Sequence, residues 1–145
     1  MTSKTKPDLE FFIKCIPPKS TSQQKGIMMI GGKPRHFKKK KVAEAESNML
    51  SLLTPFRPPK AFEGPLALEV TWTYPWRSSE TKKSKAAGFK YCTTRPDSSN
   101  VIKLLEDCMT RLNFWNDDSQ NSDLRIIRGW GDKPGIGVKI TKLED

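Results

Sequence analysis

The stretch that decides the fold covers residues 95–120 and reads RPDSSNVIKLLEDCMTRLNFWNDDSQ. Its apolar residues recur at three- and four-residue steps, which is the period of an amphipathic helix. The spacing predicts a helix over residues 100–113. Asp97, Ser98 or Ser99 stands where a side chain caps the exposed amides at a helix start.

Acidic residues stand at both ends of this predicted helix. Asp97 precedes it, and Asp117 and Asp118 follow it in a polar turn. They meet only if the chain folds back or if one of them faces a partner subunit. Gathered carboxylates repel one another unless a hard cation such as Mg²⁺ binds them. The alternative is structural, with Asp97 as a helix cap and the NDD sequence as an ordinary turn.

The segments around this stretch predict the rest of the fold. Residues 66–74 show the clearest alternation, with one face made of Leu66, Leu68, Val70, Trp72 and Tyr74. Further strands are expected at residues 8–16, 26–30, 89–94, 122–130 and 135–143, the last two joined as a closing hairpin. A second helix is expected over about residues 37–53, and residues 77–88 read as a loop or a short helix.

These elements predict one small α+β domain over residues 1–145, with a mixed β-sheet flanked by two main helices. Residues 1–7 are expected to be flexible. The N-terminus has no long apolar segment of the kind that a signal peptide needs. Three widely spaced cysteines and a single histidine, His36, disfavour a disulfide framework, a zinc site and a His-based triad. A reducing, cytoplasmic compartment fits this composition best.

The charge indicates a polyanionic partner. The chain has 26 Lys and Arg against 16 Asp and Glu, a formal net charge of +10. The alternative is a solvated basic surface without a partner. Candidate DNA-contacting residues are Arg35, Lys38, Lys39, Lys40, Lys41, Arg77, Lys82, Lys83 and Lys85. Phe114, Trp115 and Trp130 either stack on bases or belong to the core, and we expect at least two of the three in the core.

Two motifs resemble the RusA-type Holliday junction resolvases encoded by phages and prophages. PDSSNVIKLLEDCM, followed by NFWNDDSQ, is similar to that family's Asp-x-Asp-Asn, a lysine three residues later, an aspartate four residues after the lysine, and an aromatic-x-Asp-Asp-x-Gln turn. FFIKCIPPKSTSQ and GPLALEVTW are similar to the family in placement and character. The resemblance covers nearly the whole chain and is strongest over residues 95–120.

The resemblance implies a homodimeric endonuclease that cuts four-way DNA junctions with Mg²⁺, or with Mn²⁺ in its place. Asp97 and Asp118 match the family's metal-binding aspartates, with Asp117 as a helper beside Asp118. Lys103 matches the family's lysine, which assists at the phosphate. Without the resemblance, Lys103 reads as an exposed lysine paired with Asp107 at i+4.

The sequence departs from the family motif at Ser99, where the pattern has its second aspartate. Serine carries no negative charge and is a poor Mg²⁺ ligand. Three explanations are open. Either Glu69 or Asp117 replaces the missing aspartate as a metal ligand, or a water does so and the metal binds weakly. In the third, the chain binds branched DNA without cutting it. A basic RNA-binding module is a further, weaker alternative, because the chain has no RNA-recognition signature.

Overall fold

The structure, a computed structural model, describes residues 6–18, 25–30, 33–38, 40–94 and 98–144, and for residues 25–42 it describes the backbone alone. The flexibility expected for residues 1–7 therefore concerns mainly residues outside these ranges. The main sheet has five strands, in spatial order β1 (Leu9–Lys14), β7 (Gly135–Lys142), β4 (Leu66–Pro75), β6 (Asn121–Gly131) and β5 (Phe89–Tyr91).

The central strand is β4, which pairs in parallel with β6 and antiparallel with β7. All five side chains of its predicted apolar face are buried. The predicted closing hairpin between β6 and β7 is wrong, because β4 lies between these strands. The turn that follows β6 reverses the chain as expected, but both strands bond to β4, the strand with the most apolar face. The sheet is mixed, as predicted.

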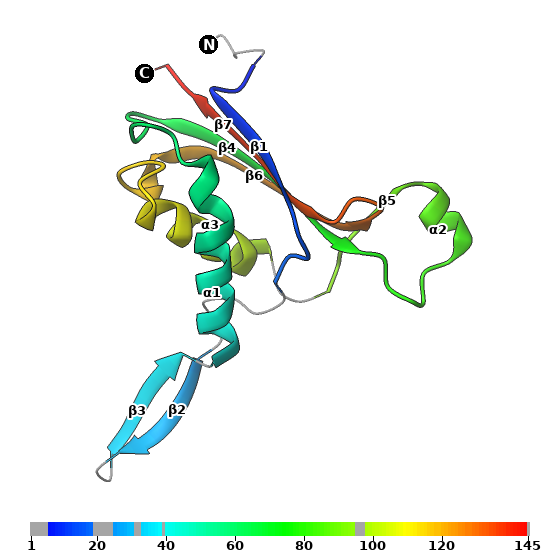
Figure 1. The fold of residues 1–145 in the computed structure, drawn as a ribbon, viewed down its shortest axis with the longest axis horizontal. Coiled ribbons are helices and arrows are strands. Elements are labelled where there is room, and N and C mark those ends of the chain that lie inside the picture. The colour runs from blue at the N-terminus through cyan, green and yellow to red at the C-terminus, as the bar shows by residue number, and fades with distance from the viewer. Residues whose placement is uncertain (1–5, 19–24, 31–32, 39, 95–97, 145) are drawn as a thin grey trace.

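Two helices pack on one face of the sheet (Figure 1). α3 (Ser98–Arg111) begins and ends two residues earlier than predicted and buries Val101, Ile102, Leu104, Leu105, Cys108 and Met109. α1 (Lys40–Leu53) buries Ala45, Met49 and Leu53. The predicted α+β architecture with two main helices is confirmed. In the part of the chain that the structure describes, no helix is long and apolar enough to cross a membrane.

A second, two-stranded sheet precedes α1. β2 (Lys25–Ile30) is the predicted second strand, and it pairs antiparallel with β3 (Lys33–Lys38), which the sequence did not predict. The start of the predicted helix at residue 37 is therefore corrected to Lys40. Residues 37 and 38 belong to β3 instead, because they pair with Gly26 and Lys25 of β2. Figure 1 shows this hairpin extending away from the main sheet.

The aromatic residues of the motif region lie in the core. Phe114, Trp115 and Trp130 are all buried, so the expected core role is confirmed and extends to all three. The indole nitrogen of Trp115 donates to Thr110 Oγ1 at 2.7 Å, which satisfies its one donor. α2 (Lys82–Ala86) is the short helix expected within residues 77–88, and β5 follows it. Both extend beyond the helix-covered part of the sheet.

Candidate active site

A tight turn after α3 returns the chain towards the middle of that helix. Asn113 has a φ of 62°, a left-handed conformation that asparagine tolerates better than most residues. The backbone N–H of Phe114 donates to Met109 O at 3.1 Å, and that of Asn113 donates to Thr110 O at 3.1 Å. The buried rings of Phe114 and Trp115 anchor the return. The chain therefore reverses direction after α3, so that Asp117 and Asp118 lie beside this helix and not beyond its end.

The aspartate-containing turn is a 3₁₀ turn (Asp118–Gln120) held by Gln120. The Gln120 Oε1 atom accepts from the backbone N–H groups of Asn116 and Asp117, at 2.8 and 3.0 Å. Its Nε2 atom donates to the carbonyl oxygens of Phe62 and Gly64, at 2.9 and 3.0 Å. One amide side chain thus closes the turn on itself and fixes it to the segment that leads into β4.

Asp117 and Asp118 are exposed at this turn and have opposite pKa shifts. The hydrogen bond from the backbone N–H of Ser119, at 2.9 Å, lowers the pKa of Asp117. Partial loss of hydration raises the pKa of Asp118, and the carboxyl groups of Asp117 and Asp107 raise it further, while Lys103 lowers it. The turn has therefore brought Asp118 within electrostatic reach of the outer face of α3.

Glu106 belongs to this group of charges, and sequence reasoning missed it. Its carboxyl Oε2 accepts from Asn121 Nδ2 at 2.7 Å, just beyond the 3₁₀ turn. Burial raises the pKa of Glu106, and the Asp118 and Asp107 carboxylates add to the rise, whereas the Asn121 bond and Lys103 lower it. The sequence contained one signal for it, since a residue three positions after Lys103 lies on the same side of a helix.

The predicted site residues on α3 form one stripe. Ser99, Lys103 and Asp107 follow one another at four-residue intervals, so they lie about 6 Å apart along the helix axis. Ser99 and Lys103 are exposed. The structure thus brings Lys103, Asp117 and Asp118 to one place and puts Ser99 one turn from Lys103. Asp97 lies outside the described residues.

Glu69, one of the two acids considered as a substitute for the missing aspartate, lies elsewhere. It projects from β4 on the opposite side from the buried alternate residues, and therefore away from α3. Its carboxylate pairs with Arg125 at 3.3 Å and with Lys139 at 3.6 Å. Of the two candidate substitutes, only Asp117 is near Asp118.

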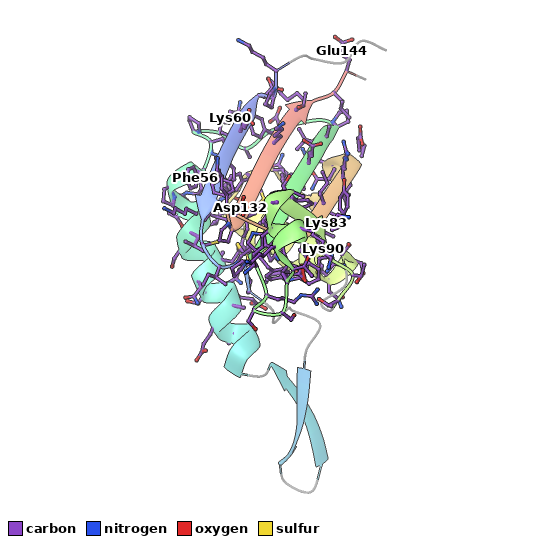
Figure 2. All side chains as sticks on the ribbon, turned by 90° about the vertical axis from the view of Figure 1, so that its right-hand side faces the viewer. Phe56, Lys60, Lys83, Lys90, Asp132 and Glu144 are labelled. Carbon is purple, nitrogen blue, oxygen red and sulfur yellow. The ribbon has the colours of Figure 1, made fainter. Side chains whose placement is uncertain are left out.

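The candidate DNA-contacting residues fall into two groups. The first lies along β3 and the start of α1 and contains Arg35, Lys38, Lys40 and Lys41, whose side chains are outside the description, as is the whole of Lys39. The second lies in and before α2, where Lys82, Lys83 and Lys85 are exposed. Figure 2 shows Lys83 and Lys90 on this side of the molecule. Arg77 already binds Glu80 at 2.6 Å and lies 3.9 Å from the centre of the Trp130 ring.

The described carboxylates meet part of what Mg²⁺ requires of its ligands. Carboxylate oxygens are suitable ligands. A bound cation would offset the repulsion from the Asp117 and Asp107 carboxyl groups, which adds to the larger effect of lost hydration in raising the pKa of Asp118. Among the described residues, however, no group of three or more His, Cys, Asp or Glu side chains is arranged to hold a metal ion. The described carboxylates therefore fit part of a magnesium site, and Asp97 is the predicted ligand that would have to extend it.

The sequence matches a family model described as endodeoxyribonuclease RusA over residues 15–141. This match begins just after β1, runs from β2 into β7, and includes every element that forms the candidate site. The chain therefore belongs to the RusA family of endodeoxyribonucleases.

Individual relatives agree with this assignment. The chain is 31% identical over 138 residues to the crossover junction endodeoxyribonuclease rusA of Lactococcus phage r1t, covering 94% of this chain and 98% of the relative. It is 43% identical over 51 residues to the enzyme of the same name from Enterobacteria phage HK97, covering 34% of this chain and 42% of the relative. It is also 32% identical over 92 residues to the uncharacterized protein YqaN of Bacillus subtilis, covering 60% of this chain and 64% of the relative.

Proposed function

We propose that this protein is a metal-dependent endonuclease that binds four-way DNA junctions and resolves them by paired phosphodiester hydrolysis. The observation that carries the proposal is the return of Asp117 and Asp118 to the face of α3 that bears Lys103, in a chain of the RusA family. A helix cap and an ordinary turn do not require a lysine and an aspartate pair to meet. Its relatives in two phages are named crossover junction endodeoxyribonucleases.

Asp97 and Asp118 are the proposed ligands for Mg²⁺, or for Mn²⁺, with Asp117 beside them. Bound at this place, the ion would polarise the phosphate and provide a water of lowered pKa. Asp118 has to be deprotonated to act as a ligand, and Lys103 favours that state by lowering its pKa. Asp117 is fixed by its bond from Ser119 and keeps the turn in shape.

Lys103 is proposed to act on the phosphate. Its ammonium is exposed, and among the described residues it forms no ion pair with Asp107 within 4.0 Å. It is therefore not held in the i+4 pair that would have made it an ordinary surface lysine. A cation there offsets the negative charge that develops on phosphoryl oxygens, or protonates the leaving oxygen.

DNA is proposed to be held mainly by charge. The net charge of +10 supplies the attraction, and the two groups of basic residues on β3–α1 and on α2 are the proposed contacts. A four-way junction has two strands to cut at related positions, so a homodimer with two sites suits it. The setting would be the cytoplasm of a bacterial host that carries the gene on a phage or prophage.

The test is cleavage of a synthetic four-way junction with Mg²⁺ or Mn²⁺, compared with a duplex of the same sequence. Asp97→Asn and Asp118→Asn are expected to abolish cleavage and leave junction binding intact. Loss of a ligand should cost more than the roughly 10- to 100-fold typical of an outer partner. Asp123→Asn is the matched control, because Asp123 is exposed on β6 and has no place in the group around Lys103. No preference for junction over duplex at moderate salt would refute the proposal.

Ser99 favours one second candidate, a non-catalytic or weakly active protein that binds branched DNA. Ser99→Asp separates the two, because position 99 lies one helical turn from Lys103. A dead binder should gain cleavage from the added carboxylate, whereas a competent enzyme should change little. The same junction assay decides between them, with Ser51→Asp as the control, since Ser51 is an exposed serine on α1.

A further inference from the structure

The side chain of Arg128 on β6 reaches the start of α3. Its Nε atom donates to Ser98 Oγ at 2.9 Å. Its Nη1 atom donates to the carbonyl oxygen of Thr94 at 2.9 Å, and its Nη2 atom donates to that of Cys92 at 3.5 Å. One guanidinium therefore binds the chain on both sides of residues 95–97.

Backbone hydrogen bonds also attach the residues before residue 95 to β6. The N–H of Cys92 donates to the carbonyl oxygen of Arg128 at 2.9 Å, directly after the β5–β6 pairing of Tyr91 with Gly129. Cys92 is buried, and its Sγ atom lies 3.6 Å from Arg128 Nη1. The residues leading to α3 are thus attached to β6 through main chain and side chain together.

We propose that Arg128 is a positioning residue for the metal site, which it serves by fixing the first turn of α3 to β6. This inference rests on the proposed function, in which Asp97 is a metal ligand. Asp97 is bonded directly to Ser98, so their Cα atoms are about 3.8 Å apart. Fixing Ser98 on one side and Thr94 on the other limits where the Asp97 carboxylate can go.

Arginine suits this task because its planar guanidinium presents donors in a fixed fork. Among the described residues it binds oxygens of Ser98, Thr94 and Cys92, which come from different directions. Lysine would keep the charge but donates from one flexible point. The positive charge also lies beside a helix N-terminus, where a cation is unfavourable. Removing it relieves that repulsion, so a neutral variant is expected to fold.

The test compares Arg128→Gln and Arg128→Lys with wild type. Arg125→Gln is the matched control, because Arg125 lies on the same strand but pairs with Glu69 on the other face of the sheet. Three measurements are made on the full chain: amide hydrogen exchange of residues 92–100, Mn²⁺ binding by calorimetry without DNA, and junction affinity without divalent metal. The Mg²⁺ dependence of cleavage is then measured with the same proteins.

Both Arg128 variants are expected to exchange faster only over residues 92–100 and to bind Mn²⁺ about tenfold or more weakly. Cleavage should need correspondingly more Mg²⁺, while junction affinity without metal stays unchanged. Arg125→Gln should match wild type throughout. Unchanged exchange and Mn²⁺ affinity in both variants would overturn the inference, as would full recovery in Arg128→Lys, which would assign the effect to charge. If wild type neither binds Mn²⁺ nor cuts junctions, the proposed function itself fails, and hydrogen exchange still decides whether Arg128 holds the segment.

Discussion

At position 99 a serine hydroxyl stands where the related motif has an aspartate. Spacing alone left open whether Lys103, Asp117 and Asp118 meet, and the resemblance to the family motif predicted that they belong to one site. The structure places Asp118 within electrostatic reach of Lys103. The sequence was not sufficient to single out Glu106, because a glutamate in the polar part of an amphipathic helix looks like a solvated residue. Its partial burial depends on the turn returning to α3, and the bond from Asn121 depends on β6. The turn and the Asn121 bond both lie outside α3, so the helix sequence alone does not reveal them.

The raised pKa of Asp118 predicts the acidic side of the pH profile. As pH falls through this raised pKa, Asp118 takes up a proton, and metal binding and cleavage are lost earlier than an ordinary aspartate would require. In Asp107→Asn one of the charges that raises this pKa is gone, so the acidic limb of cleavage at fixed Mg²⁺ should move to lower pH. A limb that stays in place, or moves to higher pH, would contradict this account. Asp123→Asn serves again as the control.

The raised pKa of Asp118 also determines whether the stability of the protein rises or falls with pH. In the folded state the Asp118 carboxyl holds its proton more tightly than in the unfolded chain. Its contribution to the free energy of unfolding therefore falls as pH rises from the usual aspartate pKa through the raised one. Adding a divalent cation above that range should recover part of the loss, since it binds the charged form.

Among the elements, the 3₁₀ turn depends most clearly on a single side chain, that of Gln120. The sequence placed Gln120 in the motif without assigning it a role, and in the structure its side chain makes four hydrogen bonds that close the turn and attach it to residues before β4. Sequence reasoning could identify the motif but not this role, because Phe62 and Gly64 are more than fifty positions away.

Gln120→Ala should therefore lower stability and activity together. The substitution leaves the N–H groups of Asn116 and Asp117 and two carbonyl oxygens without their partner, a cost of about 1–3 kcal/mol. Urea unfolding would measure this loss, and junction cleavage the loss of Asp118 placement. Asn116→Ala is the control, because its side chain is exposed and its N–H remains, so its effect should stay within about 0.5 kcal/mol. Equal unfolding free energies for the two variants would rule out this role.

Strand existence was easier to predict than strand neighbours. The alternation in β4 and the helical period in α3 are local, and both were correct. The order of β6 and β7 was not, because the GDKPG turn signals a chain reversal without identifying the adjacent strand. The deciding factor was the pairing available on both edges of β4, which no local window contains.

Over the whole molecule, the net charge of +10 predicts a strong dependence of junction affinity on salt. The slope of log affinity against log salt should be about −0.9 for each phosphate contact. Replacing Lys82, Lys83 and Lys85 by Gln should flatten this slope by about 1 for each lysine that contacts a phosphate. Lys139→Gln is the control, because Lys139 pairs with Glu10 and Glu69 on the other side of the sheet. An unchanged slope in the triple variant would remove α2 from the DNA surface.

The position of β7 has a consequence for how the protein is made. β1 is synthesised first of the described strands, but its neighbour in the sheet is β7, which is synthesised last of them. Until residues 135–142 emerge, β1 has no strand beside it and β4 has one bare edge. The nascent chain therefore has to carry its apolar strands unassembled for most of its synthesis. A protein built in this way completes its central sheet only after β7 has been translated.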